Sequence, residues 1–377
     1  MNKIGTTLLN FDPKLNRLAK DKEIRQGLSV VLQTGKCLWL ANDETISLER
    51  LSLQPQAPDE SPQFGGHLQF NLADYLKLAA PPGSDPMEIE EADIEGLAAS
   101  DGYLWLVGSH SLKRAKPKAA DPAKKGAKRL AKIANDGNRF LLARIPVVDR
   151  AEGQTLAKEE NNAGRTRTAA LLRGDATGNE LTRALAEDAH LKPFLSVPGK
   201  DNGFDIEGLA VIGERILLGL RGPVLRGWAI VLEVQPEDTG DPAALSLAPI
   251  GSDKQRYRKY FLRLDGLGIR DLCVQGDDLL ILAGPTMDLD GPVKVFRWVG
   301  GRNPADEGLV PEETICLVGE IPFGQGAEKR FDHAEGMCLF ADAAGGTSAL
   351  LVVYDSAAPG RFRHGQGTVT ADIFAFS

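Results

Sequence analysis

Short apolar runs bounded by turn residues recur along the whole chain and predict an all-β protein. Five of them are especially clear, because each is a stretch of about five almost wholly apolar residues. These runs occupy residues 37–41, 103–107, 216–220, 279–283 and 350–354. Apolar runs of this length between turn residues are typical of buried strands. A shorter strand-like run stands ahead of each one, so the pattern predicts a pair of adjacent strands repeated five times.

A four-residue motif precedes each of these strand pairs. Its first position is polar, its second mostly glycine, its third long and aliphatic, and its fourth small. The five copies begin at Gln26, Glu95, Glu207, Arg270 and Glu335. The step from the second copy to the third is 112 residues long, and the other four steps are between 63 and 69 residues. One of those four runs through the carboxyl end back to the first copy, which is expected of a closed ring of repeats.

This spacing predicts a five-bladed β-propeller that forms a single domain, residues 1–377. Each unit has room for about four strands, the size of a propeller blade, and the motif opens the innermost strand. The blades are expected at residues 24–80, 93–200, 204–265, 268–323 and 333–377. Residues 3–11 are expected to close the ring as the fourth strand of the last blade, which removes the exposed sheet edges that a β-protein must protect.

The long step predicts an insertion in the second blade, within residues 113–190. Near its end, residues 179–190 place Leu181 and Leu185 at helical spacing, so a short surface helix is expected there. The insertion is therefore expected to be partly helical.

The start of the insertion is strongly basic. Residues 113–132 contain nine lysines and arginines and one acidic residue, Asp121. Aromatic residues are not interleaved with them, which argues against a stacking surface for single-stranded nucleic acid. The expectation is a solvated loop, or a contact with an acidic partner protein or with the acidic residues 85–95 of the same chain.

Composition narrows the class of protein. The chain has 377 residues and a net charge of −8, and this acidic balance disfavours nucleic acid as a partner. No apolar run has the length of a membrane span or of a signal-peptide core, so we expect a cytoplasmic protein with no membrane partner. The four cysteines form no C-x-x-C pair and are expected to be free thiols.

The first positions of the motif are expected to converge on the axis of the ring. Glu95, Glu207 and Glu335 would then meet there with Gln26 and Arg270. Like charges held close together must be neutralised by a raised pKa, a cation or a positive side chain. Two alternatives stay open: Arg270 and water neutralise the ring, or Glu95, Glu207 and Glu335 bind Ca²⁺, which favours several carboxylate oxygens. No motif for a nucleotide or an organic cofactor is found.

Charged side chains near the ends of the inner strands are expected to form a ligand site at the axial mouth. Arg221 is the strongest candidate, because it lies in a turn directly after a strongly apolar strand. Guanidinium groups pair well with phosphate or carboxylate oxygens, so a small anionic ligand is expected. The expected ligand-binding residues are Arg221, Arg270, Lys200, Asn202, His110 and Asp355.

Three segments resemble a bacterial family of uncharacterised function, and this resemblance covers most of the chain. They are residues 93–98 (DIEGLA), 200–211 (KDNGFDIEGLAV) and 219–228 (GLRGPVLRGW). The doubled DIEGLA is also distantly similar to the esterase-like domain found with some phytases, which is a propeller class. The fourth motif departs from this pattern, with Arg270 in place of a glutamate and Asp271 in place of glycine. No catalytic assignment follows from the family.

Three functions remain open, and the sequence does not decide whether the protein is an enzyme. The first is binding of a small anionic ligand at the axial mouth, with or without a divalent cation. The second is metal-dependent hydrolysis of phosphoesters or related esters, with Glu207 or His333 as general base and Arg221 as electrostatic stabiliser. The third is a protein-interaction scaffold that uses residues 113–132 as its contact.

Overall fold

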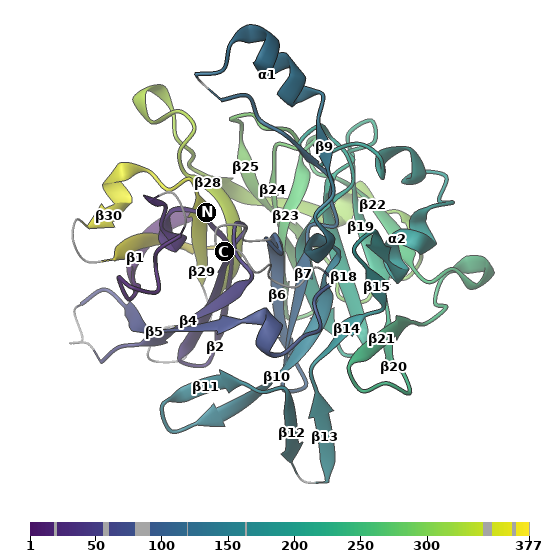
Figure 1. The fold of residues 1–377 in the computed structure, drawn as a ribbon, viewed down its shortest axis with the longest axis horizontal. Helices are drawn as coiled ribbons and strands as arrows, with labels where there is room; N and C mark the ends of the chain where they lie inside the picture. Colours follow the sequence, from purple (N-terminus) through teal and green to yellow (C-terminus); the bar gives the residue numbers. More distant parts are fainter. Residues whose placement is uncertain are drawn as a thin grey trace.

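The computed structural model describes residues 1–18, 21–55, 60–79, 91–118, 120–162, 164–341, 349–363 and 367–376. In these residues the fold is all-β and propeller-like, with few helices (Figure 1). Of the acidic residues 85–95, those before residue 91 lie outside the described part of the chain. None of the helices in the described part is long and apolar enough to cross a membrane.

Antiparallel sheets follow one another along the chain, each starting at an inner strand. The first contains β2 (Leu28–Thr34), β3 (Cys37–Asn42), β4 (Ser47–Leu53) and β5 (Gln63–Asn71). The second begins with β6 (Ile94–Ser100), β7 (Tyr103–Gly108), β10 (Leu142–Arg150) and β14 (Ala170–Leu172). The third contains β17 (Asp205–Ile212), β18 (Arg215–Gly222), β19 (Trp228–Val234) and β22 (Arg258–Arg263).

The last two sheets continue this order. The fourth contains β23 (Gly268–Gln275), β24 (Asp278–Gly284), β25 (Val293–Trp298) and β27 (Ile315–Ile321). The fifth contains β28 (His333–Phe340), β29 (Ala349–Asp355), β31 (Thr368–Ala375) and β1 (Asn2–Asn10), with β30 (Phe362–Arg363) beside β31. The N-terminal strand β1 pairs with β31 over almost its whole length, so the chain ends close the last sheet together.

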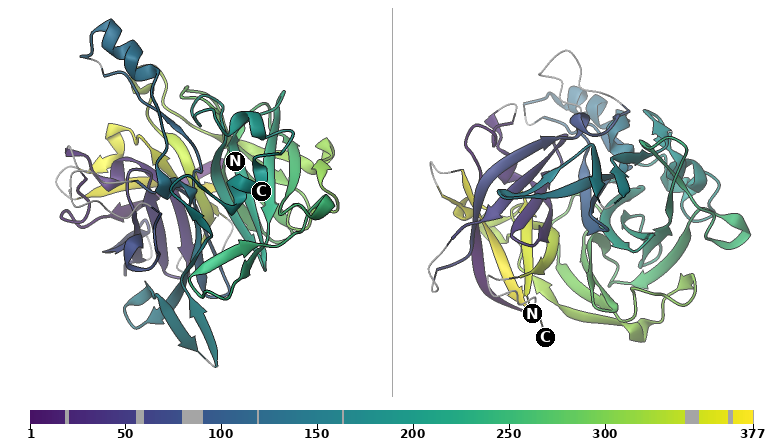
Figure 2. Two further views of the ribbon diagram at one scale, coloured as in Figure 1. Left: turned by 45° about the vertical axis from the view of Figure 1, so that its right-hand side comes forward. Right: turned by 90° about the horizontal axis from the view of Figure 1, so that it is seen from below.

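The inner strands contact one another in a cycle. β2 contacts β6, β6 contacts β17, β17 contacts β23, β23 contacts β28, and β28 contacts β2. Figure 2 (right) shows the sheets arranged in chain order around a common centre. Apolar clusters fill the spaces between neighbouring sheets, for example Trp39 and Leu48 of the first sheet against Leu104 and Leu106 of the second. Both faces of these sheets are buried, which explains why the central strands are continuously apolar.

Parallel pairs at the outer edges link the sheets in a way that the repeat spacing does not predict. β21 (Ala244–Leu247) pairs in parallel with β14, and β20 (Pro236–Asp238) follows it, so a segment after β19 extends the second sheet. β26 (Gly308–Leu309) extends the third sheet beside β22. β1 pairs in parallel with β5 and so joins the first sheet to the fifth. The outer strands therefore exchange between units that the spacing treats as separate.

Ser29, and not Gln26, is the residue of β2 that corresponds to Glu95 of β6. In β6 the pairing with β7 shifts register at Glu95, and in β2 the corresponding shift falls at Ser29. Gln26 instead ends the 3₁₀-helix η2 (Ile24–Gln26), is exposed, and accepts a hydrogen bond from the backbone N–H of Glu23. The expectation that Gln26 reaches the axis is wrong. Ser29 holds the equivalent place, where its Oγ donates to the carbonyl of Ile94 at 2.8 Å.

The insertion forms an arm on one side of the ring. Residues 113–134, here called the basic arm, consist of β8 (Lys113–Arg114), α1 (Ala123–Leu130) and β9 (Ile133–Ala134), and the arm projects from the sheets (Figure 1). Within the segment expected to be a solvated loop, residues 123–130 therefore form a helix. The arm also contacts an acidic residue of its own chain, because Lys113 forms an ion pair with Glu91.

The helix expected within residues 179–190 is α2 (Glu180–Leu185), which is anchored by its apolar side. Leu181 and Leu185 are fully buried, and the Asn179 side chain caps the helix by accepting from the N–H of Thr182.

Short two-stranded sheets complete the insertion: β12 (Glu159–Asn162) with β13 (Arg165–Thr168), and β15 (Gly174–Asp175) with β16 (Gly178–Asn179); β11 (Gly153–Leu156) pairs with β10. The remaining 3₁₀-helices are η3 (Leu72–Asp74), η4 (Gly137–Phe140), η5 (Lys192–Phe194), η6 (Ser252–Lys254), η7 (Glu312–Thr314), η8 (Gly326–Glu328) and η9 (Pro359–Arg361).

Candidate functional site

Bulges in the inner strands aim the charged motif residues. Glu95, Glu207, Arg270 and Glu335 are each the extra residue where the inner strand shifts register against its neighbour. A bulge leaves one residue out of the regular pairing and redirects its side chain. The same irregularity in four sheets therefore presents four charged side chains at one end of the ring.

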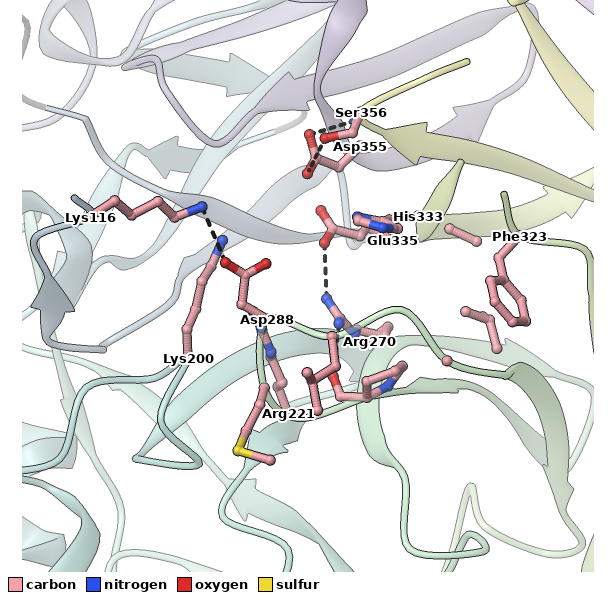
Figure 3. Close-up of a pocket in the computed structure, with 16 residues that line it drawn as sticks. Lys116, Lys200, Arg221, Arg270, Asp288, Phe323, His333, Glu335, Asp355 and Ser356 are labelled. Atoms are coloured by element: carbon pink, nitrogen blue, oxygen red, sulfur yellow. Dashed lines mark hydrogen bonds and ion pairs between the residues drawn. The ribbon is translucent and has the colours of Figure 1, made fainter. Parts of the chain in front are cut away.

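Two arginines contact two of the three motif glutamates. Arg221 on β18 places its Nη1 2.7 Å from Oε1 of Glu207 and donates from Nε to the carbonyl of Thr286. The Nη1 of Arg270 lies 3.1 Å from Oε2 of Glu207. The same Nη1 lies 2.9 Å from Oε1 of Glu335 (Figure 3). Burial alone would raise the pKa of Glu207, but Arg221 and Arg270 outweigh it and lower the pKa. Glu207 is thus an ionised carboxylate held between two guanidinium groups.

Among the described residues, Glu95 and Asp43 form no ion pair with a lysine or arginine. Burial, followed by the charges of Asp93, Glu207 and Glu335, raises the pKa of Glu95 well above its usual value. Burial and the charge of Asp355 raise the pKa of Asp43 to about 8. One side of the mouth therefore carries carboxyl groups that hold their protons to a higher pH than usual.

The residues that were expected to bind Ca²⁺ do not form a closed ligand set. Among the described residues, no group of three or more His, Cys, Asp or Glu side chains is placed to hold a metal ion. Arg221 and Arg270 occupy oxygens of Glu207 and Glu335, which leaves Glu95 as the unpaired member of the predicted triad. Calcium stays a prediction.

Two adjoining hollows open at this end of the ring. The smaller, of about 100 Å³, is lined by Lys200, Arg221, Arg270, His333, Glu335 and Asp355, among others (Figure 3). The larger, of about 1220 Å³, lies between the basic arm and a floor that includes Asp43, Asp93 and Glu95. Lys116, Lys200, Arg221 and Asp288 line both, so the small cavity continues into the large cleft.

Lys200 stands at the junction of the two hollows. Among the residues that the structure describes, no carboxylate forms an ion pair with its Nζ, whereas Lys116 beside it pairs with Asp288 at 3.4 Å (Figure 3). Burial and the charge of Arg221 would lower the pKa of Lys200, but Glu335, Asp43 and Asp93 outweigh them and raise the pKa. Lys200 is therefore a charged ammonium, and it lines the same cavity as the positively charged Arg221.

His333 lines the small cavity and has a carboxylate partner. Its Nε2 lies 3.1 Å from Oδ1 of Asp290, and both side chains are largely buried, at 30% and 14% exposed. Asp355 also lines this cavity, and its Oδ1 accepts from the N–H of Ser356. The other predicted residues that line it are Lys200, Arg221, Arg270 and Glu335.

Two expected ligand-binding residues line neither hollow. His110 is buried, its Nδ1 donates to the carbonyl of Gly108, and its Nε2 accepts from the side chain of Asn179. Burial lowers the pKa of His110 to about 4, so this histidine is neutral. Its two hydrogen bonds connect β7 to the insertion. Asn202 accepts from the N–H of Val224 through its side-chain oxygen and holds a turn.

Sequence reasoning missed Arg139. This buried side chain pairs with Asp93 at 2.9 Å and with Glu91 at 2.6 Å, and it lines the large cleft. It lies in η4 of the insertion, outside every repeat, so no periodic position marks it. An arginine beside an apolar run was the only available signal.

Comparisons with known proteins give a family and loose structural likenesses. A family model described as a protein of unknown function, DUF3616, matches residues 27–372. No curated protein matches the chain. The similarity to the phytase-associated domain is not shown by these comparisons.

Three solved structures illustrate the likenesses. A GH43 β-1,3-galactosidase solved with galactodeoxynojirimycin is 8% identical, with 97% of this chain and 94% of that chain covered and a TM-score of 0.39. Sqt1 of Chaetomium thermophilum is 12% identical, with coverages of 94% and 82% and a TM-score of 0.32. The phage phi92 endosialidase is 8% identical, with coverages of 98% and 69% and a TM-score of 0.35. At these TM-scores the likenesses assign no activity.

Proposed function

We propose that the protein, which belongs to the DUF3616 family of proteins of unknown function, is a five-bladed β-propeller that binds a small anionic ligand at its axial mouth. The cyclic contacts of β2, β6, β17, β23 and β28 support five blades, since each of these strands begins an antiparallel run of strands. The runs that begin at β2 and β28 are joined into one nine-stranded sheet by the parallel pair of β1 with β5. The ligand site is the small cavity together with its opening into the large cleft.

The observation that carries the ligand proposal is the convergence of three cations on the small cavity. Lys200 precedes β17, Arg221 lies on β18 and Arg270 lies on β23, so different elements bring them together. Lys200 and Arg221 are close enough for their charges to oppose each other. An anion between them would relieve this repulsion and would accept charge-assisted hydrogen bonds from both.

The arginines are already oriented for this task. The carbonyl of Thr286 holds Arg221 and the carbonyl of Pro285 holds Arg270, at 2.9 and 2.8 Å. A guanidinium group has five N–H donors, so each arginine keeps N–H donors that are not used by these hydrogen bonds and ion pairs. Preorganised donors lose little freedom when a ligand binds, which favours affinity. The volume of about 100 Å³ suits a carboxylate or phosphate group, since one water takes about 30 Å³.

Titration calorimetry with inorganic phosphate tests the proposal. The wild type is expected to bind phosphate, and Lys200→Gln is expected to weaken binding about tenfold or more, because a charge-assisted hydrogen bond contributes about 1.5–3 kcal/mol. Lys36→Gln, an exposed lysine in the turn between β2 and β3, is the matched control. Absence of binding by the wild type, or equal affinity of Lys200→Gln, would refute it. A parallel titration with added Ca²⁺ tests whether a cation takes part.

A protein-binding role is a second candidate, and the basic arm favours it. The arm projects from the sheets, and its Leu130 and Ile133 are each 47% exposed beside the lysines of α1 (Figures 1 and 2). A basic surface with exposed apolar side chains suits an acidic partner segment.

A further inference from the structure

His333 and Asp290 form a dyad on the wall of the anion cavity. The Asp290 carboxylate can only accept, so the neutral imidazole carries its proton on Nε2, where it faces Oδ1 at 3.1 Å. Nδ1 is then left with its lone pair, and no hydrogen bond within the described residues engages it. A histidine whose tautomer is set by a buried carboxylate is the arrangement that general base catalysis uses.

We propose that this dyad makes the cavity a hydrolytic site for phosphate monoesters, with His333 as the general base. This inference rests on the proposed function, because the phosphoryl group has to be the anion held by Lys200, Arg221 and Arg270.

The reaction needs water as its only co-reactant. Nδ1 of His333 takes a proton from a water molecule while the water oxygen forms a bond to phosphorus and the ester P–O bond breaks. The attacking and departing oxygens lie on opposite sides of phosphorus, so the departing oxygen takes its proton from solvent water and the imidazolium releases its proton to solvent. The products are an alcohol and inorganic phosphate. No oxidation or reduction takes place, and no further group is required.

The three cations supply what this transition state needs. Phosphoryl transfer spreads negative charge over the equatorial oxygens of phosphorus, and fixed positive groups stabilise it with little reorganisation. Lys200 and Arg221 line the cavity together with His333, so base and cations share one space.

The two hollows suggest which part of an ester goes where. The small cavity has room for a phosphoryl group, and the cleft of about 1220 Å³ beside it can take the alcohol portion. Leu130 and Ile133 of the arm line this cleft and are half exposed, so they offer an apolar surface to that portion. An aryl phosphate therefore matches the site in both charge and apolarity.

Hydrolysis of p-nitrophenyl phosphate tests the inference in the full-length protein. His333→Gln is expected to lower kcat about 100-fold or more, the usual contribution of a general base, while its affinity for inorganic phosphate changes less than about twofold. Asp290→Asn replaces an acceptor-only carboxylate by an uncharged amide that can face either tautomer of His333, and it is expected to lower kcat with KM unchanged. His190→Gln is the control, because His190 contacts Lys259 and lines neither hollow.

A separate measurement of phosphate binding distinguishes failure of the hydrolytic inference from failure of the proposed anion binding. If the wild type binds phosphate but turns over no faster than His333→Gln, the hydrolytic inference is wrong and the binding function stands. If the wild type does not bind phosphate, both fail. Loss of phosphate binding in a folded His333→Gln would make this histidine a ligand contact and would also overturn its role as base.

Discussion

Gly336 on β28 packs directly against the backbone of Val30 on β2, and this contact joins the last inner strand to the first. A Cβ atom at residue 336 would lie 2.8 Å from the Cα of Val30, which is closer than real Cβ atoms approach other atoms. A Cβ atom at residue 96 would lie 2.5 Å from Cβ of Leu209, and one at residue 208 would lie 2.8 Å from Cγ of Leu272. The glycine of the repeated motif is therefore required where the next inner strand approaches.

Gly336→Ala is expected to destabilise the protein, because an added methyl group pushes β2 away from β28. Overpacking of this kind costs about 1–3 kcal/mol, measurable by urea unfolding. Gly5→Ala is the matched control, since a Cβ at residue 5 meets nothing within 4 Å. Equal stability of the two variants would show that the ring does not close through this contact.

Arg221→Leu is expected to cost about 3–5 kcal/mol of unfolding free energy, since it leaves the buried carboxylates of Glu207 and Asp205 without their nearest cation. The double variant Arg221→Leu with Glu207→Leu should recover part of this loss, because the unpaired charge is then absent. A double-mutant cycle measures the coupling. A double variant less stable than Arg221→Leu by the full cost of Glu207→Leu would mean that the pair is not coupled.

Stability is expected to fall as pH rises from about 5 to 8. Burial, together with neighbouring carboxylates, raises the pKa of Asp43 and Glu335 to about 8, and of Asp205 to about 7. The folded protein then holds protons that the unfolded chain, with ordinary carboxyl pKa values near 4, has already released in this range. Stability is therefore greatest below this window and is lost as pH rises through the folded pKa values.

The thermal midpoint measured across this range checks the sign. Carboxylates with lowered pKa, such as Glu207 and Asp372, act only below about pH 4.5 and do not interfere. Asp43→Asn should flatten the slope. A midpoint that stays constant or rises with pH would contradict the prediction.

Removal of the basic arm is expected to leave the ring folded. β8 and β9 pair directly, and the N–H of Ala115 bonds to the carbonyl of Lys132, so an Asn-Gly turn can replace residues 116–131. The ion pair of Lys116 with Asp288 is at the surface and contributes about 0–1 kcal/mol. Phosphate affinity should survive because Lys200, Arg221 and Arg270 remain.

Poly-glutamate serves as a probe of the arm's proposed protein-binding role. The wild type should bind it at low salt and the shortened protein should not, as measured by fluorescence anisotropy. Unchanged binding after removal of the arm would assign the interaction to another surface.

The repeated strand pairs could be predicted because each depends on neighbours in the sequence. The apolar run 279–283 indicates a buried strand whatever the rest of the chain does, and it became β24. The outer strands could not be predicted in the same way. β21 and β26 join sheets started by other repeats, through parallel pairs with residues far along the chain, and a two- or four-residue segment carries no mark of its partner.

The site divides along the same line. Sequence alone determined that glutamates and an arginine occupy the first position of a recurring motif, because the motif is local and its spacing is regular. Only the tertiary structure decided that Gln26 is replaced by Ser29, that Arg139 meets Asp93, and that Asp290 holds His333. The pairing and neutralisation of charged side chains depend on the distance between them in space. The register of a strand depends on its partner strand. Both are therefore set only when the sheets assemble.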